Sequence, residues 1–357
     1  MKGWIGKIRA LFLLSSLSLI LSGCGEEDLS ALIPKGYGAD AILDLINISL
    51  AVMIFVLAVV MIIFVIVVVR FRKKKNDEDF VPEQTEGNKA LEVIWTVIPI
   101  ILLVIIAVPT VTTTFDLEDS SGAEADDAIN ITVTANQFWW HFAYEGEDIQ
   151  TSQDLYIPVG EKVYLNLQSN DVIHSFWVPA LSGKKDTNPE NVNTMFIQAD
   201  EEGVYEGRCA EFCGLAHSLM DFSVVAVSQE EYDQWVAGMQ NVDPEAEPQE
   251  AIAQEGKELF EENSCIGCHA VGPSPVAVGP NLANFGERRF VGGTEENTKE
   301  NIIEWILYPE EKKPGNAMAE ADYAVSREEA AKIADYLLQL QPTGIDFDSA
   351  KDSAEQQ

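Results

Sequence analysis

The chain is poor in the residues that bind metals and in positive charge. Its 357 residues include only 5 cysteines and 4 histidines, and 23 lysines and arginines face 58 aspartates and glutamates. The net charge of −35 at pH 7 excludes nucleic acid as a partner, because binding to phosphates needs a basic surface. Thiols and imidazoles are so scarce that a place where they cluster is informative.

Three of these nine cysteines and histidines fall in one short run. Cys209 and Cys213 are four residues apart, His217 is four further on, and Met220 follows three later. Thiolate and thioether are soft ligands suited to copper, and imidazole suits copper as well. Two alternatives stay open: a disulfide between the cysteines, or a structural zinc held by two Cys and two His. Met220 argues against zinc, and the spacing favours copper.

The N-terminus is typical of a secretory signal. Three basic residues among the first nine precede an apolar run over 10–21, and Leu21-Ser-Gly-Cys24 resembles the bacterial lipobox. We therefore predict a signal peptide over 1–23, cleavage before Cys24 and lipidation (palmitate) of that residue. The alternative is an unmodified cysteine in an ordinary signal.

Two longer apolar stretches, at about 46–69 and 93–111, reach the ~20 residues that cross a bilayer. The loop 70–92 between them opens with the densest basic cluster of the chain, Arg70-Phe-Arg-Lys-Lys-Lys75, and the positive-inside rule puts it in the cytoplasm. Residues 24–111 are thus predicted to form a transmembrane hairpin in the lipid of a bacterial plasma membrane. Everything after Val111 then lies on the extracytoplasmic face.

Nearly all the acid lies in that outer region. Residues 112–357 hold 47 aspartates and glutamates against 13 lysines and arginines. One interpretation is solubility, or adaptation to a saline or alkaline exterior. The other is attraction of a cationic partner by electrostatic steering that salt would weaken. Both stay open.

The first outer domain, 112–240, is predicted to be all β. Runs that alternate apolar and polar residues lie at 129–134, 162–167 and 222–227, with turn-forming pieces between them. Short strands at this spacing indicate a sandwich or barrel, and a helix is predicted after them at 229–239.

The second outer domain, 251–342, is predicted to be all α. It follows an acidic, proline-bearing linker at 241–250 and precedes a polar tail at 343–357. Ser326 followed by Glu329 predicts a capping box at the start of its last helix. The predicted helices are 251–262, 298–307 and 328–340.

The second domain contains the attachment sequence for c-type haem, Cys265-Ile-Gly-Cys268-His269. The two cysteines can form thioethers to the haem vinyl groups, and His269 then reaches the iron. The alternative is a redox CxxC followed by a chance histidine. The predicted export and the helical surroundings favour haem.

The sixth iron ligand follows by elimination. Methionine or histidine is usual in electron-transfer cytochromes, and Met318 is the only one of either after His269. Five-coordinate iron is the alternative. Pro280 could place its carbonyl against the His269 ring N–H and fix the ring orientation, or it could belong merely to a turn.

These motifs together resemble subunit II of haem–copper cytochrome c oxidases, of the bacterial caa type with a class I cytochrome c fused to its C-terminus. The resemblance implies a membrane-anchored multidomain fold: a two-helix transmembrane hairpin, an all-β cupredoxin-like Greek-key barrel and an all-α cytochrome c domain. It implies a dinuclear CuA centre bridged by the two cysteines, and a magnesium at the subunit I boundary that the Glu211 side chain helps hold. The implied copper ligands are His174, Cys209, the Glu211 carbonyl, Cys213, His217 and Met220.

Other residues acquire hypotheses from the same resemblance. Glu92 lies where the family has a glutamate near a proton channel of subunit I, although it could be a solvated carboxylate at a helix end. Phe138 stands where the family's proposed electron-entry tryptophan is found, with Trp139 and Trp140 beside it. This puts the conventional entry route in doubt and fits a tethered donor; the alternative is an aromatic core strand. His141 is interpreted as structural.

The function implied is that of an electron-transfer subunit of a terminal oxidase. Electrons would pass from external cytochrome c or another donor through haem c and CuA to subunit I, where oxygen becomes water and protons are pumped. The tether would raise the effective concentration of the donor haem. One alternative is a membrane-bound CuA and haem c carrier that serves another terminal reductase. Another is a quinol oxidase subunit, a family that generally lacks the copper ligands.

Overall fold

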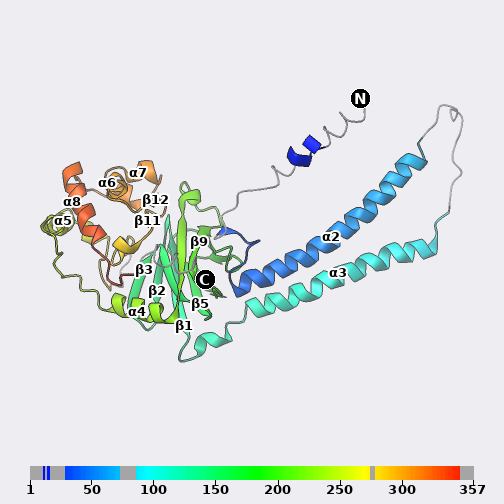
Figure 1. Cartoon of the computed structure of the whole chain (residues 1–357), viewed down its shortest axis with the longest axis horizontal. Helices are drawn as coiled ribbons and strands as arrows, with labels where there is room; N and C mark the ends of the chain where they lie inside the picture. The colour runs from blue at the N-terminus through cyan, green and yellow to red at the C-terminus, as the bar shows by residue number, and fades with distance from the viewer. Residues whose placement is uncertain (1–10, 13, 17–28, 73–85, 274–277, 346–357) are drawn as a thin grey trace.

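The structure is a computed structural model that describes residues 11–12, 14–16, 29–72, 86–273 and 278–345. Cys24, most of the predicted signal peptide and the tail after Ile345 lie outside the described residues. Two long helices extend side by side from a β domain, and a smaller helical domain lies on another side of that domain (Figure 1). The predicted fold class is confirmed.

The two long helices are α2 (Tyr37–Arg70) and α3 (Lys89–Leu117), and both are long and apolar enough to cross a membrane. Both helices extend beyond the predicted stretches. Hydropathy marks only the part of a helix that lies in the hydrocarbon of the membrane, whereas the backbone hydrogen bonds of the helix continue past that part. The N-terminal turn of α2 is held by the β domain, where Ala39 N–H donates to the Leu181 carbonyl at 3.0 Å. Asn88 caps α3 by accepting from the N–H groups of Ala90 and Leu91.

The β domain consists of two five-stranded sheets. The first has the order β3 (Ile149–Ser152), β2 (Trp139–Tyr144), β1 (Ile129–Asn136), β5 (Val163–Ser169) and β8 (Asn193–Ile197). The second has the order β4 (Asp154–Pro158), β10 (Asp221–Val227), β9 (Gly203–Cys209), β6 (His174–Trp177) and β7 (Lys185–Thr187). Only the pairs β1–β5 and β4–β10 are parallel.

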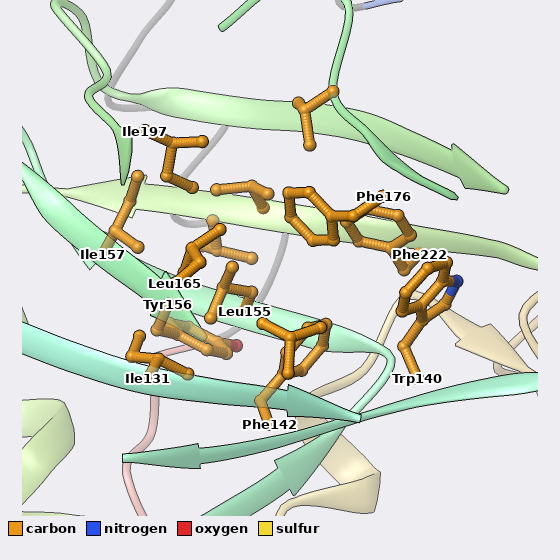
Figure 2. Packing of buried hydrophobic residues seen from close by; sticks show 14 of the residues in the cluster. Ile131, Trp140, Phe142, Leu155, Tyr156, Ile157, Leu165, Phe176, Ile197 and Phe222 are labelled. Carbon is orange, nitrogen blue, oxygen red and sulfur yellow. The ribbon is translucent and has the colours of Figure 1, made fainter. Parts of the chain in front are cut away.

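The core of this domain lies between the two sheets. Alternate residues of each strand point inward, so β5 shows a strictly alternating burial pattern. Figure 2 shows Trp140 of the first sheet beside Phe222 of the second, and Ile131 of the first beside Tyr156 of the second; the Phe142 ring also contacts Phe222. Helix α4 (Gln229–Gln240) begins where predicted, at a capping box formed by Ser228 and Glu231, and it adds Trp235 to the same core.

The helical domain is built from α5 (Ala251–Glu262), α6 (Lys299–Leu307), α7 (Pro309–Lys312) and α8 (Arg327–Leu338). The predicted capping box of Ser326 and Glu329 is present at the start of α8. The remaining short elements are 3₁₀ turns at Ser121–Glu124, His217–Leu219, Cys265–Gly267, Phe285–Glu287 and Ala317–Glu320, and a small hairpin of β11 (Phe290–Val291) and β12 (Glu295–Glu296).

The end of the described chain returns to the β domain. Ile345 is buried in the core cluster of the sandwich, and Tyr156 Oη donates to its carbonyl at 3.4 Å. Glu287 accepts from the N–H groups of Thr343 and Gly344. The segment predicted as a polar tail from residue 343 therefore begins with packed residues, because the apolar side chain of Ile345 is buried in the neighbouring domain.

Candidate metal and haem centres

The copper-type residues come together at one end of the second sheet. Cys209 is the last residue of β9, Met220 immediately precedes β10, and the loop between them carries Cys213 and His217. His174 is the first residue of β6, which pairs antiparallel with β9. In this pair, Phe176 of β6 lies opposite Cys209 of β9. Strand pairing thus brings a histidine 35 residues away in sequence next to the loop.

The donor atoms form two sets, one around each sulfur. Cys209 Sγ lies 3.9 Å from His174 Nδ1 and 3.2 Å from the Glu211 carbonyl oxygen. Cys213 Sγ lies 3.6 Å from His217 Nδ1 and 3.9 Å from Met220 Sδ. The two sulfurs are 3.8 Å apart, whereas a disulfide needs about 2.05 Å. Six donors in two sets fit a centre of two copper ions better than one four-coordinate zinc.

The two thiols of this cluster affect each other's ionisation. Their contact, with help from His174, lowers the pKa of the Cys209 thiol, and the same contact together with burial raises the pKa of the Cys213 thiol. Asp171 Oδ1 lies 2.7 Å from His174 Nε2, so the ring directs its Nδ1 toward Cys209. Such a carboxylate fixes the tautomer of a metal-binding histidine. We did not predict Asp171; its only signal in the sequence is a carboxylate three residues before the histidine.

Two other sequence candidates have exposed side chains. The carboxylate of Glu211 is exposed, while its carbonyl faces Cys209. Glu92 lies in the exposed first turn of α3, where the Thr96 hydroxyl donates to its carbonyl. Neither carboxylate belongs to the donor cluster around the sulfurs.

The haem motif faces a large apolar cavity. Its volume is about 500 Å³, and its lining includes both motif cysteines, His269, Pro280 and Met318. The Pro280 carbonyl lies 2.9 Å from His269 Nδ1, which leaves Nε2 for a metal, and burial lowers the pKa of the imidazole. Thiols, an imidazole and a thioether around an apolar space fit a covalently attached haem. Apolar side chains complete the lining, among them Phe260, Leu282, Phe285, Val291, Ile302 and Ile333.

The β domain closes one side of this cavity. Phe138 and Trp139 both line it, together with Gln137 and Gln153. Trp140 points the opposite way from Trp139, because successive strand residues face opposite sides; it is fully buried in the sandwich, and its ring lies 6.2 Å from the His174 ring. The three aromatic residues grouped by the sequence therefore lie in two environments, and only the first two face the cavity.

His141 lies in the same strand, β2, and is buried. It pairs in register with Ser152, and burial lowers the pKa of its imidazole to about 4. Its Nδ1 has no hydrogen-bond partner within the described part of the chain. His141 belongs to neither donor set, which fits the structural interpretation.

Family models match three successive parts of the chain. Residues 38–113 match the transmembrane domain of cytochrome c oxidase subunit II, residues 144–227 match its periplasmic domain, and residues 253–341 match cytochrome c. The matched ranges correspond to the helical hairpin, the β domain and the helical domain that contains the large cavity.

Two proteins named cytochrome c oxidase subunit 2 match nearly the whole length of the chain. The chain is 50% identical to cytochrome c oxidase subunit 2 of Alkalihalophilus pseudofirmus, covering 95% of this chain and 99% of that protein. It is 43% identical to the Bacillus subtilis protein of the same name, covering 92% and 96% respectively. Quinol oxidase subunit 2 of B. subtilis is 35% identical over only 66% of this chain and 74% of that protein.

The family carries a copper centre in its periplasmic domain, and the matched cytochrome c domain implies haem c. The copper-type donor cluster and the haem-type cavity lie in those two domains. The partners implied are subunit I and the rest of an oxidase complex. From its membrane helices to its second outer domain, the chain belongs to the cytochrome c oxidase subunit 2 family, with a fused C-terminal cytochrome c domain.

Proposed function

We propose that the chain brings electrons into a proton-pumping terminal oxidase on the extracytoplasmic face of a bacterial plasma membrane. Electrons would come from an external cytochrome c or a similar donor and would end in subunit I, where oxygen is reduced to water. When bound, the haem and the copper pair supply sites that accept and release single electrons. The observation that carries this proposal is that the segment 138–140, where β2 begins, borders both donor sets: Phe138 lines the haem cavity, and the Trp140 ring lies 6.2 Å from the His174 ring.

Cys209 and Cys213 would supply the thiolate ligands of a copper site that holds two ions. His174 and the Glu211 carbonyl would complete one side, and His217 and Met220 the other. The two sets of short donor distances around the sulfurs support this division. The exposed Glu211 carboxylate is free to help hold a magnesium ion at the boundary with subunit I.

The proposed haem site uses Cys265 and Cys268 for the thioether bonds and the His269 Nε2 and Met318 Sδ atoms for the iron. The hydrogen bond to Pro280 orients the imidazole. The apolar lining of the cavity excludes water, and the buried strand residues around the copper donors do the same. A dry, fixed environment keeps reorganisation small when charge arrives or leaves, which is what an electron-transfer site requires.

The proposed topology has α2 and α3 crossing the membrane with the Arg70–Lys75 cluster inside. Glu92 would then lie near the cytoplasmic mouth of a proton path in subunit I. We also propose that residues 1–23 are removed and that Cys24 carries lipid. The basic cluster and the lipobox-like sequence support the same orientation independently.

Gentle detergent extraction of native membranes tests the proposal. We expect this chain to co-purify with a large polytopic subunit that contains haem a, and metal analysis of the isolated outer region of the chain should give two coppers and one haem c iron for each copy. Isolation without such a partner would support the alternative, a membrane-bound carrier for another terminal reductase. A preparation that lacks copper but oxidises quinol would support the quinol oxidase alternative.

Met318 can be tested separately from the rest of the site. Met318→Leu should remove the charge-transfer band of methionine-ligated haem c while leaving the haem covalently attached, because the thioether bonds are made elsewhere. Persistence of the band would show that another residue is the sixth ligand.

A further inference from the structure

Lys313 is a buried lysine at the junction of the two outer domains. Its side chain is 3% exposed, and its ammonium donates to the Phe138 carbonyl of the β domain at 3.0 Å and to the Gly292 carbonyl of its own domain. No carboxylate forms an ion pair with it within the described residues. Burial lowers the pKa of Lys313 to about 8, against the opposing effect of Asp221. A charge this deeply buried needs its hydrogen bonds, so both carbonyl contacts matter to the fold.

The neighbouring lysine has a different environment. Lys312 is partly exposed and pairs with Glu295 of its own domain at 3.3 Å. In the part of the chain that the structure describes, Lys312 makes no hydrogen bond or ion pair with the β domain. The two adjacent residues carry the same charge, but of the two only Lys313 hydrogen-bonds to the β domain.

The residue that Lys313 holds lies between the two centres. The Phe138 ring lies against Gly214 of the copper loop, where an added Cβ would come within 3.0 Å of its Cζ atom. Cε2 of the same ring would lie 3.7 Å from a Cβ added at Gly315, and Leu215 of the copper loop would lie 3.2 Å from it. Gly315 precedes Met318 by three residues, so the Phe138 ring and Leu215 both lie between the copper loop and the loop of the proposed iron ligand.

The residue before Phe138 continues this connection. The Gln137 side-chain amide donates to the carbonyl of Cys213, and both Gln137 and Phe138 line the haem cavity. The adjacent residues Gln137 and Phe138 thus line the haem cavity, hydrogen-bond to the backbone of Cys213 and accept a hydrogen bond from the ammonium of Lys313.

Other contacts across the junction differ in kind. Asn281 N–H donates to the Ser152 hydroxyl at 2.9 Å, in buried surroundings. Arg289 approaches Glu206 at 3.5 Å, and both side chains are partly exposed, so this ion pair contributes little to docking. Lys313 supplies a buried hydrogen bond from a charged donor, five residues before the proposed iron ligand in sequence.

We propose that Lys313 is a positioning residue for electron transfer between the haem and copper centres. Its ammonium fastens the haem-binding domain to the backbone of Phe138, and it thereby keeps the Phe138 ring and the Gln137 amide between the two centres. The inference rests on the proposed function and adds to it the residue that sets the geometry of the internal transfer step.

The test uses the full-length chain in its purified oxidase, with Lys313→Met as the main variant and Lys312→Met as the matched control. Lys313→Gln, which retains one neutral donor, keeps the test available if the methionine variant does not assemble. The first readout is hydrogen–deuterium exchange at the Asn281 amide, which reports opening of the junction. The second is the distance distribution between oxidised haem c and the copper centre from pulsed EPR. The third is the rate of electron transfer from haem c to copper after rapid haem reduction.

We expect Lys313→Met to raise exchange at Asn281 at least about tenfold, because hydrogen bonds from a charged donor are lost. Helices α5 and α8 should stay as protected as in the unmodified chain. The haem-to-copper distances should broaden and the internal transfer should slow, with the haem and copper spectra retained. Lys312→Met should change none of these readouts.

Two results would overturn the inference. In the first, the Lys313 variants match Lys312→Met at the junction and in internal transfer. In the second, exchange rises equally in α5 and α8, which would mean that Lys313 stabilises its own domain. Failure of the proposed function looks different: the unmodified chain would then lack the copper or haem c signal, while the exchange measurement would still decide whether Lys313 holds the domains together.

Discussion

The copper-type cluster and the haem-type cavity differ in how much of each the polypeptide completes by itself. The copper-type donors lie within 4 Å of one another in the pairs around the two sulfurs, on the ends of paired strands. The haem motif instead surrounds about 500 Å³ of space, formed largely by short helices and loops. The β sandwich has a complete core of its own, whereas the helical domain needs its cofactor as part of the core. Metal binding should therefore adjust the first domain, and haem attachment should decide whether the second one folds.

The largest expected effect is on the haem domain. Replacing Cys265 and Cys268 together by alanine should abolish the c-type absorption band and the cooperative unfolding of this domain. An unfilled cavity of about 500 Å³ corresponds to a cost on the order of 10 kcal/mol, comparable with the whole stability of a small domain. Calorimetry and the optical spectrum of the purified chain measure both effects. The copper signal should survive; its loss would contradict independent folding of the two centres.

A smaller effect is expected from one thioether of the β domain. Met220→Leu should change the near-infrared and EPR pattern of the copper centre while the haem bands stay as they are, because the volume is conserved and only a donor atom is removed. Met239→Leu is the matched control, since Met239 is also buried in this domain but belongs to α4 and to neither donor set. An identical pattern in the two variants would exclude Met220 as a ligand.

The next effect is a dependence of stability on pH that comes from the buried His141 of β2. The pKa of His141 is lowered to about 4, so the folded state keeps the ring neutral while the unfolded state takes up a proton below about 6.5. Stability should therefore be fully present above pH 6.5 and should fall by about 3 kcal/mol as pH drops toward 4. Replacing His141 with phenylalanine should remove this part of the acid sensitivity. Thermal unfolding between pH 4 and 7.5 measures it, and equal slopes for both chains would refute the assignment.

The smallest effects come from matched helix caps in the two domains. Ser228 and Ser326 each form a capping box, at the start of α4 and of α8. Replacing either serine with alanine should cost about 1 kcal/mol. If the domains unfold separately, each change should lower only the transition of its own domain in calorimetry. A shift of both transitions by either variant would show that the junction couples their unfolding.

Much of the fold could be predicted because its signals are local. The apolar stretches mark the membrane helices, Ser326 and Glu329 mark the start of α8, and the strand runs show in their alternation. The thiol, imidazole and thioether donors of the copper loop are close in sequence, so their spacing alone indicates a shared site. His174 is distant in sequence, and it entered only through the family resemblance. Strand pairing of β6 with β9 is what brings it to Cys209.

The sequence by itself determined which residues can act as ligands and in which segment each lies. Ligand chemistry depends on residue type, and short spacing is a property of the chain, so neither depends on the fold. Tertiary structure alone decided what those segments face. It directed Phe138 toward the haem cavity and Trp140 into the sandwich, brought Asp171 to His174, and buried Ile345 in the neighbouring domain. It also made Lys313 differ from Lys312, although the two are adjacent and chemically identical. The physical reason is that burial and partner choice depend on contacts between residues far apart in the chain, which strand register and domain docking create.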